Sequence, residues 1–248
     1  MNILVCISRV PDTAAKIMIG DDGKTIKTQG VKFIVNPFDE FAIEEALKLR
    51  EKDGGEVTAV TVATDQATDV LRTALAMGVD KVILVKGEEN PDSYYVAHNL
   101  AKVAKDVNPD LILMGKQSVD FDSLQMPSML AEMLDMPSVS VVADLNVEAD
   151  KLTAQRDIEG GREVVEASLP CIVSAQKGLN EPRYPKLPDI MKAKSKPIDQ
   201  RDAETVDRKV SVTKMELPSK ARKGNIMGDS EQDVKELVRL LHEEAKII

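Results

Sequence analysis

The stretch "EVTAVTVATDQATDVLRTALAMGVDKVILV", residues 56–85, contains one complete strand–helix–strand unit. Its two ends, 56–62 and 81–85, are short apolar runs rich in valine, which is typical of buried strands. Between them, residues 68–77 repeat apolar side chains at helical spacing, and Gly78 provides the break after the helix. Two nearly continuous apolar strands around a helix predict parallel strands that are covered on both faces.

The same alternation continues on both sides of this unit. Strands are expected at residues 2–7, 31–35, 109–115 and 138–143, and helices at 37–53, 93–105 and 123–134. We therefore expect an α/β fold with a doubly wound, mostly parallel Rossmann-like sheet of the adenine-nucleotide-binding type. Ligands of such sheets bind at the carboxyl ends of the strands.

After residue 143 the pattern changes to an antiparallel ribbon, with turns expected at 149–150 and 160–161. A short strand is expected at 209–216 and an amphipathic helix at 231–245. The chain is thus divided into an α/β domain, a proline-rich loop and a C-terminal arm, which span residues 1–174, 175–197 and 198–248. Near the N-terminus, the Asp-Gly-containing segment 16–27 predicts a hairpin.

Composition excludes several classes of function. The formal net charge of −9 argues against general nucleic-acid binding. No apolar run reaches the roughly 18 residues of a membrane span, so we expect no direct membrane insertion. Cys6 and Cys171 lie in strand-like runs and are expected as buried thiols of a reducing compartment. A bacterial cytoplasm is expected, or the mitochondrial matrix if the source is eukaryotic.

One loop is a candidate anion site. The segment "MGKQSVDFDSLQMPS", residues 114–128, leaves a buried strand at Gly115 and enters the next helix. Gly115 allows close approach of the backbone to a ligand, and Lys116 supplies a positive charge. Free backbone N–H groups before the helix attract an anion such as a nucleotide phosphate. An ordinary strand-to-helix turn is the alternative. Asp120 and Asp122 are interpreted as helix caps or ligand-hydroxyl acceptors rather than as catalytic groups.

The stretch "LNEPRYPKLPDIMKAKSKP", residues 179–197, predicts neither a good helix nor a good strand. It contains four prolines and five basic residues around Leu187. Prolines that preform a loop reduce the entropy lost on docking, and the basic side chains can steer an acidic partner. A solvated basic linker is the alternative.

Five segments of the sequence, taken in order, resemble the β subunits of electron transfer flavoproteins over nearly the whole chain. They are "VNPFDEFAIEEALKLRE" (35–51), "LRTALAMGVDKVILV" (71–85), "LILMGKQSVDFD" (111–122), "RDIEGGREVVEASLPCIV" (156–173) and "LNEPRYPKLPDIMKAKSKPI" (179–198). The order of all five makes the resemblance specific.

The resemblance implies a non-enzymatic subunit of a heterodimer with an α subunit. Such heterodimers carry electrons from flavoprotein dehydrogenases, including the acyl-CoA dehydrogenases of fatty acid β-oxidation. The electrons pass to the respiratory chain through electron transfer flavoprotein–quinone oxidoreductase. The redox-active FAD lies mainly in the α subunit. The β subunit binds AMP in a structural role and supplies a recognition loop.

The resemblance also implies site residues. Those near AMP fall on Cys6, Asn36, Pro37, Phe38, Asp39, Val62, Gly115, Lys116, Gln117, Ser118, Val119, Asp120, Phe121, Asp122, Ser123, Leu124, Gln125 and Met126. Phe38 is implied to lie near the flavin, where a second aromatic of the family is replaced by Thr13. The partner-docking residues fall on Arg183, Tyr184, Leu187, Ile190, Met191 and Lys192, with Leu187 as the anchor.

Two alternatives stay open. Electron-bifurcating relatives hold a second FAD in place of AMP, but they have small residues where Phe121 and Leu124 stand here. The bulk of these two side chains favours AMP. A nucleotide-using α/β enzyme is the other alternative, although we find no Walker motif for it. The C-terminal helix is expected to pack on the α subunit, or else on its own chain.

Overall fold

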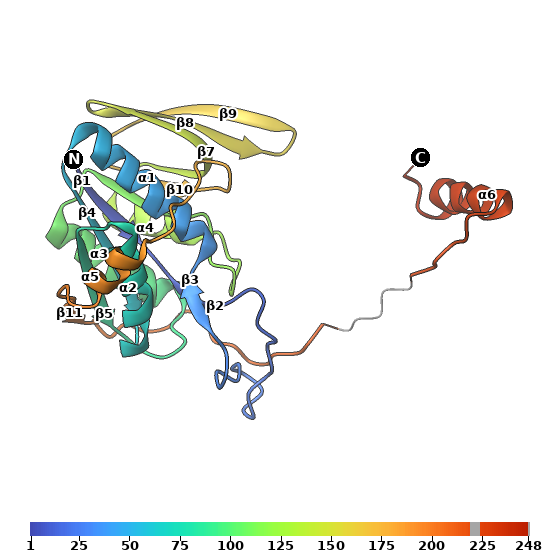
Figure 1. Cartoon of the computed structure of the whole chain (residues 1–248), viewed down its shortest axis with the longest axis horizontal. Helices are drawn as coiled ribbons and strands as arrows, with labels where there is room; N and C mark the ends of the chain where they lie inside the picture. Colours follow the sequence, from blue (N-terminus) through green and yellow to red (C-terminus); the bar gives the residue numbers. More distant parts are fainter. Residues whose placement is uncertain (219–223, 248) are drawn as a thin grey trace.

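The computed structural model describes residues 1–218 and 224–247 and confirms the α/β architecture (Figure 1). The strands of the large sheet are β1 (Asn2–Cys6), β4 (Glu56–Ala63), β5 (Lys81–Lys86), β6 (Leu111–Gly115), β7 (Ser138–Glu148), β8 (Lys151–Ile158), β9 (Gly161–Ser168), β10 (Cys171–Ala175) and β11 (Asp199–Asp202). Their order is β11-β5-β4-β1-β6-β10-β7-β8-β9. All neighbours from β11 to β7 are parallel, and β8 and β9 continue the sheet as the expected antiparallel ribbon.

Helices cover both faces of this sheet. The helices of the described residues are α1 (Pro37–Asp53), α2 (Thr68–Met77), α3 (Ser93–Val107), α4 (Met126–Leu134), α5 (Leu187–Ala193) and α6 (Glu231–Arg239), with the short helices η1 (Asp65–Ala67) and η2 (Leu240–Glu244). Helices α6 and η2 do not take part in covering the sheet. Helices α1, α2 and α5 contribute to the core on one face, and α3 and α4 to the core on the other. A separate two-stranded sheet is formed by β2 (Arg9–Pro11) and β3 (Phe33–Val35).

The two cores follow from the two-residue period of the strands. In β1, Ile3 and Val5 point into the core under α1 and α2, whereas Leu4 and Cys6 point into the core under α3 and α4. Cys171 of β10 belongs to the first core, so it faces away from Cys6. Both cysteines are free and buried, as expected from the sequence.

The order in which the strands are added to the sheet reverses at β1. Strand β1 pairs with β4 on one side and with β6 on the other, so the chain winds outward first toward β5 and then in the opposite direction. Such a reversal leaves a crevice outside the carboxyl ends of the strands, where doubly wound proteins bind ligands. The carboxyl ends of β1, β4 and β6 therefore delimit the candidate site.

Two sequence expectations about the C-terminal third are wrong. Residues 187–193 of the proline-rich loop form α5, because Pro188 lies in the first turn, where a helix needs no N–H donor. Polar residues 199–202 lie in the C-terminal arm, where a strand is expected only at 209–216, yet they form β11 because their backbone pairs with the exposed edge of β5. Both elements depend on contacts with distant parts of the chain, which local composition does not report.

Two further expectations also fail. The helix expected from residue 123 begins at Met126, and the strand expected at 209–216 does not form. The backbone N–H groups of Lys209 and Val210 donate to the carboxylate of Asp92, and that of Met215 donates to the carbonyl of Gly23, rather than to a neighbouring strand. The hairpin expected at 16–27 is confirmed by an antiparallel bridge between Ile19 and Ile26.

The expected C-terminal helix is present as α6, followed directly by η2. Figure 1 shows α6 apart from the large sheet, and none of its side chains is buried. Residues 219–223 and 248 of the predicted arm lie outside the described residues. No helix in the described ranges is long and apolar enough to cross a membrane.

The central strand should dominate the stability of this fold. Leu113 lies in the middle of β6 and is fully buried, so Leu113→Ala should cost about 2–5 kcal/mol through lost contacts and an unfilled cavity. Val164 on the outer strand β9 is 65% exposed, and Val164→Ala should cost less than about 0.5 kcal/mol. Urea unfolding of both variants checks this order, and equal midpoints would contradict the assigned core.

Candidate functional site

A single buried carboxylate joins three segments at the candidate site. Asp39, in the first turn of α1, is 3% exposed. Its Oδ2 accepts a hydrogen bond of 2.6 Å from the N–H of Ser8, just after β1. Its Oδ1 accepts one of 2.9 Å from the N–H of Gly115, the last residue of β6. Asp39 thus fixes the start of α1 against the ends of both central strands.

Gly115 is required by this arrangement. A Cβ atom at this position would lie 2.4 Å from Oδ1 of Asp39 and 2.6 Å from Cβ of Phe38. The sequence suggested that this glycine opens the backbone to a ligand. The structure shows that the first turn of α1 occupies the space that a side chain at position 115 would need.

Asn36 joins the second loop to the same point. It is fully buried, its Nδ2 donates to the carbonyl of Gln117 at 2.9 Å, and its Oδ1 accepts from the N–H of Val119 at 3.2 Å. Asn36 stands at the N-cap position of α1, but its side chain makes no capping hydrogen bond. Pro37 follows in the first turn, where its missing N–H has no cost. Asn36 therefore holds the loop after β6 against the start of α1.

Burial controls the ionisation of this cluster. Removal from water raises the pKa of Asp39 to about 7, although hydrogen bonds from Asn36, Ser8 and Gly115 favour its charged form. Burial, and then the charge of Asp39, also raises the pKa of the Cys6 thiol far above its ordinary value. Cys6 is therefore a protonated, inert thiol that closes the end of β1. Val62, 8% exposed, lies near the end of the neighbouring strand β4.

The loop between β6 and α4 is partly fixed by its own side chains. The Gln117 side chain donates to Asp122, whose N–H donates to the carbonyl of Ser118 at 2.9 Å. Asp120 accepts from the N–H of Phe121. Neither aspartate caps α4, so the expected capping role is wrong: the N-cap residue is Gln125.

The end of this loop exposes backbone donors. The φ angles of Asp122 and Leu124 are 57° and 52°, a left-handed conformation that turns the chain sharply before α4. Within the described ranges, the N–H groups of Ser123 and Leu124 have no hydrogen-bond partner. They precede the positive end of α4, which begins at the half-buried Met126. Such unpaired donors suit an anion.

One aromatic and one aliphatic side chain of the loop are exposed to solvent. Phe121 is 59% exposed and Leu124 is 48% exposed. At the base of the loop, Nζ of Lys116 lies 4.9 Å from the ring centroid of Phe38, within range of a cation–π interaction. Residues that the sequence assigned to AMP and to the flavin wall thus lie at one end of the sheet. Some of them, such as Asp39 and Asn36, are buried supports, and others belong to the exposed loop between β6 and α4.

The predicted docking residues form a second location, on and beside α5. An exposed apolar group is formed there by Tyr184, Leu187, Ile190 and Met191, which we call the Leu187 patch. Leu187 is 73% exposed. Lys192 has its Nζ 4.0 Å from a carboxylate oxygen of Asp189. Arg183 differs from the others because its guanidinium is already paired with Glu44 and Glu51 of α1.

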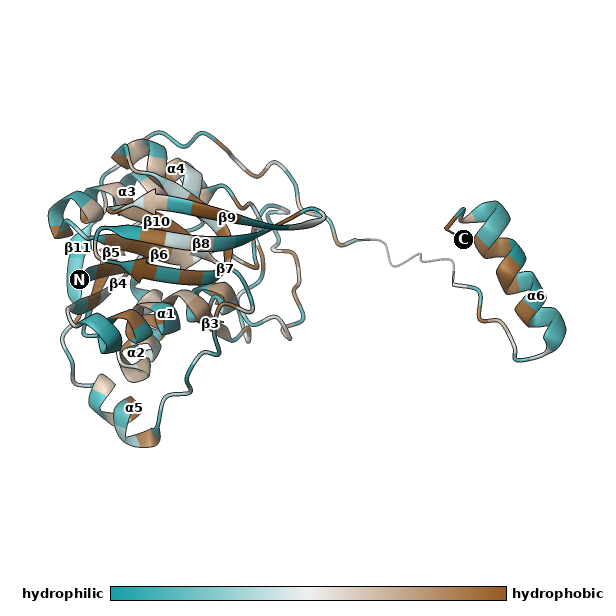
Figure 2. Cartoon of the chain, turned by 90° about the horizontal axis from the view of Figure 1, so that it is seen from above, coloured by the Kyte–Doolittle hydropathy of each residue, from teal (hydrophilic) through white to brown (hydrophobic). Residues whose placement is uncertain are grey.

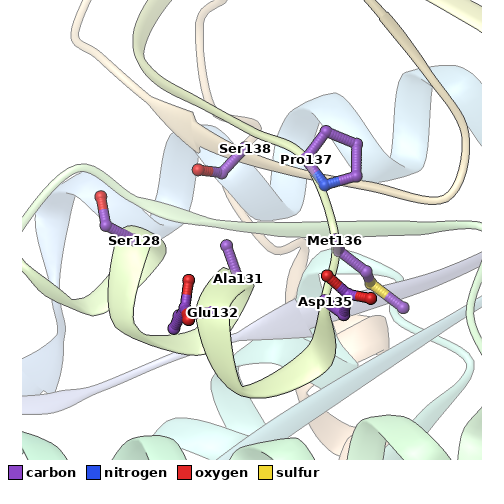
Figure 3. A pocket seen from close by; sticks show the side chains of 7 residues that line it. All are labelled: Ser128, Ala131, Glu132, Asp135, Met136, Pro137 and Ser138. Atoms are coloured by element: carbon purple, nitrogen blue, oxygen red, sulfur yellow. The ribbon is translucent and has the colours of Figure 1, made fainter.

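A hollow elsewhere in the molecule does not suit a nucleotide. It lies along the C-terminal half of α4 and the start of β7 (Figure 3). Figure 3 shows the carboxylates of Glu132 and Asp135 among its lining residues, which include no basic side chain. A phosphate would be repelled by these charges. Within the described residues, no group of three side chains is arranged to hold a metal ion.

Comparison with known proteins gives a consistent result. Residues 23–206 match the family model described as "Electron transfer flavoprotein domain". The chain is 43% identical to "Electron transfer flavoprotein subunit beta" of Bacillus subtilis over 259 aligned positions, which cover 100% of both chains. It is 43% identical to the protein of that name from Homo sapiens, with 80% of each chain covered. The mitochondrial protein of Oryza sativa is 37% identical, with 100% of each chain covered.

The raised pKa of Asp39 gives a pH-dependent test of the site. Asp39→Asn retains the shape but places an amide donor against one of two backbone N–H groups, which should lower the free energy of unfolding by about 1–3 kcal/mol. In the unfolded chain this carboxyl has its ordinary pKa of 3.8, whereas in the folded protein the pKa is about 7. The wild type therefore loses stability at this residue as the pH rises from about 4 to about 7.

The Asn variant lacks that loss, so its deficit should be larger at pH 5 than at pH 8, by roughly 1–3 kcal/mol. Urea unfolding of the full chain at both pH values measures the difference. Asp207→Asn, at an exposed carboxylate, is the matched control and should show nearly the same stability as the wild type at both. A deficit of Asp39→Asn that grew with pH would contradict the assignment.

Proposed function

Because the chain belongs to the electron transfer flavoprotein family, we propose that it acts as the β subunit of a heterodimeric electron carrier. In this proposal it performs no bond chemistry, binds AMP at the strand ends and docks redox partners through the Leu187 patch. The observation that carries the proposal is the coincidence of two independent features. Unpaired backbone donors lie at the strand-end loop, and an apolar patch lies exposed on α5.

The polar atoms around the strand ends divide into two groups that fit a bound mononucleotide. Asp39 and Asn36 are buried and use their side-chain atoms on the protein backbone, so we assign them to holding the loops. The N–H groups of Ser123 and Leu124 are free, and Lys116 lies nearby in sequence at the base of the same loop. We assign these donors to the phosphate of AMP.

AMP is favoured over a second FAD by the size of the loop side chains. Phe121 and Leu124 lie on the loop along which a longer dinucleotide would extend. Burial of their exposed apolar surface would be favourable in free energy. The redox-active FAD, bound mainly by the α subunit, would supply the electron chemistry. On this chain, Phe38 with Lys116 beside its ring would then form part of the wall next to the flavin.

The partner surfaces follow from exposed apolar side chains. The Leu187 patch would be covered by a dehydrogenase such as an acyl-CoA dehydrogenase, and the carrier would then pass electrons to electron transfer flavoprotein–quinone oxidoreductase. Helix α6 exposes Val234, Leu237 and Val238, and Figure 2 shows hydrophobic positions along this helix. We assign that face to the α subunit. Relatives from both Bacillus and plant mitochondria are compatible with a bacterial cytoplasm or a mitochondrial matrix.

The nucleotide content of the purified heterodimer tests the first part of the proposal. Denaturation should release one AMP and one FAD for each heterodimer, because the bulk of Phe121 and Leu124 disfavours a second flavin. Chromatography of the released nucleotides against standards gives the ratio. Two FAD and no AMP would establish the electron-bifurcating alternative, and steady ATP turnover by the purified protein would favour the nucleotide-using enzyme.

Leu187→Ala tests the docking surface. A leucine side chain that becomes fully buried contributes about 1.5–3 kcal/mol, so truncation should weaken docking by roughly 10–100-fold. Electron delivery from an acyl-CoA dehydrogenase should slow at subsaturating concentrations, while FAD content and unfolding stay unchanged. Val164→Ala removes a similarly exposed side chain from β9 and should dock normally. Loss of FAD or of the α subunit from Leu187→Ala would show that the patch is structural.

A further inference from the structure

The segment that carries the Leu187 patch is attached to the protein on both sides of the patch. On its N-terminal side, Arg183 and Asn180 bond to α1. On its C-terminal side, the guanidinium of Arg72 in α2 donates to the carbonyl of Ala193 at 2.5 Å and to that of Lys196. Nζ of Lys196 in turn donates to the carbonyl of Val79 at 3.3 Å. The exposed patch is therefore held between two internal anchors.

The N-terminal anchor is a two-carboxylate arrangement around Arg183. Its Nε and Nη2 donate to the two oxygens of Glu44 at 2.8 and 3.0 Å. Its Nη1 and Nη2 donate to the two oxygens of Glu51 at 2.6 and 3.2 Å. The backbone N–H of Arg183 also donates to Glu44 at 3.1 Å. We call Arg183, Glu44 and Glu51 the Arg183 clamp.

The Glu44 side of the clamp is directed into the protein. The side chain of Glu44 is only 8% exposed, so this carboxylate is not available to a partner. Hydrogen bonds with Glu44, and then with Glu51, raise the pKa of Arg183 further above its ordinary value, and the same guanidinium lowers the pKa of Glu51. Two carboxylates surround one guanidinium, which leaves no net positive charge there to attract an acidic partner.

Asn180 extends the same anchor. Its Nδ2 donates to the carbonyl of Phe41 and to Oε2 of Glu45, both at 2.9 Å. Glu45 is 4% exposed. Two successive glutamates of α1 thus receive the segment that enters the patch. Glu44 and Glu51 are two turns apart on α1, so they lie on the same side of the helix.

We propose that Arg183 is a positioning residue, which holds the Leu187 patch in its docking conformation through α1 and makes no contact with the redox partner. The proposal rests on the proposed docking function, and it changes the role expected for Arg183 from its place in the recognition loop. Its physical basis is preorganisation. A segment that is already ordered loses less conformational entropy when a partner covers it.

Variants on opposite sides of the clamp separate this role from direct contact. Arg183→Met and the double variant Glu44→Gln/Glu51→Gln both break the clamp, but the second leaves the guanidinium free. If Arg183 positions the patch, each should weaken docking by about tenfold, and combining all three changes should weaken it no further. If Arg183 instead contacted the partner directly, Glu44→Gln/Glu51→Gln should dock as well as the wild type or better, because the released cation would bind an acidic partner.

Charge-matched controls keep the comparison fair. Lys151→Met, on β8, removes one positive charge, as Arg183→Met does. Glu159→Gln/Glu166→Gln, on the β8–β9 ribbon, removes two negative charges, as the clamp pair does. Both controls should dock as the wild type does. Docking by the glutamine pair at wild-type strength, with a loss only for Arg183→Met, would overturn the proposal.

Hydrogen exchange of the full chain provides a readout that needs no partner. Amides of residues 187–193 should exchange several-fold faster in both clamp variants than in the wild type and in both controls. Arg183→Lys should restore little, because an ammonium group does not form two paired hydrogen bonds with each carboxylate. Unchanged exchange in the clamp variants would overturn the proposal even if docking were weakened.

The same measurements separate a failure of the docking function from a failure of the positioning role. If wild type and Leu187→Ala dock equally poorly to an acyl-CoA dehydrogenase but the clamp variants loosen residues 187–193, the proposed function fails and the positioning role on the free chain stands. If Leu187→Ala weakens docking but the clamp variants dock normally, the docking function stands and the positioning role fails.

Discussion

The fold and its site depend on one buried carboxylate. Asp39 receives the N–H groups of Ser8 and Gly115, and so joins the start of α1 to the ends of the two strands between which the sheet reverses direction. A buried carboxylate costs free energy unless hydrogen bonds compensate it. Gly115 is constrained by the same contact, because any side chain there would overlap Phe38 and Asp39. The geometry of the candidate nucleotide site is thus set by groups that do not themselves face a ligand.

Helix α1 connects the two candidate functional regions of the chain. Its first turn shapes the strand-end site, and its glutamates 44, 45 and 51 receive the segment that leads to the Leu187 patch. The second anchor of that segment is Arg72 of α2. Both helices lie on the same face of the sheet, so one layer supports the segment that carries the Leu187 patch while the apolar side chains of the patch stay exposed. In the proposed docking function, an ordered support and an exposed tip both serve a carrier that docks and then releases its partner.

The sequence predicted much of this correctly where local signals are strong. Valine-rich runs predicted the parallel strands, and Gly78 marked a helix end that the structure confirms. Local signals failed where pairing is long-range. The polar run at 199–202 becomes a strand only because β5 offers an open edge, and α5 forms against α2 despite three flanking prolines. The valines at 210 and 212 have the composition of a strand but remain exposed, with backbone donors bonded to Asp92 instead.

The candidate site shows the same division. The sequence by itself determined the sheet class and the family to which the chain belongs, and it predicted the strand ends as the place for a ligand, because periodicity and residue order are local properties. Only the tertiary structure decided the roles of individual side chains. Asn36 is a loop tether rather than a helix cap, and Arg183 is paired within the chain before any partner arrives. Such roles depend on which groups meet across dozens of residues, and therefore on the packing of the whole chain.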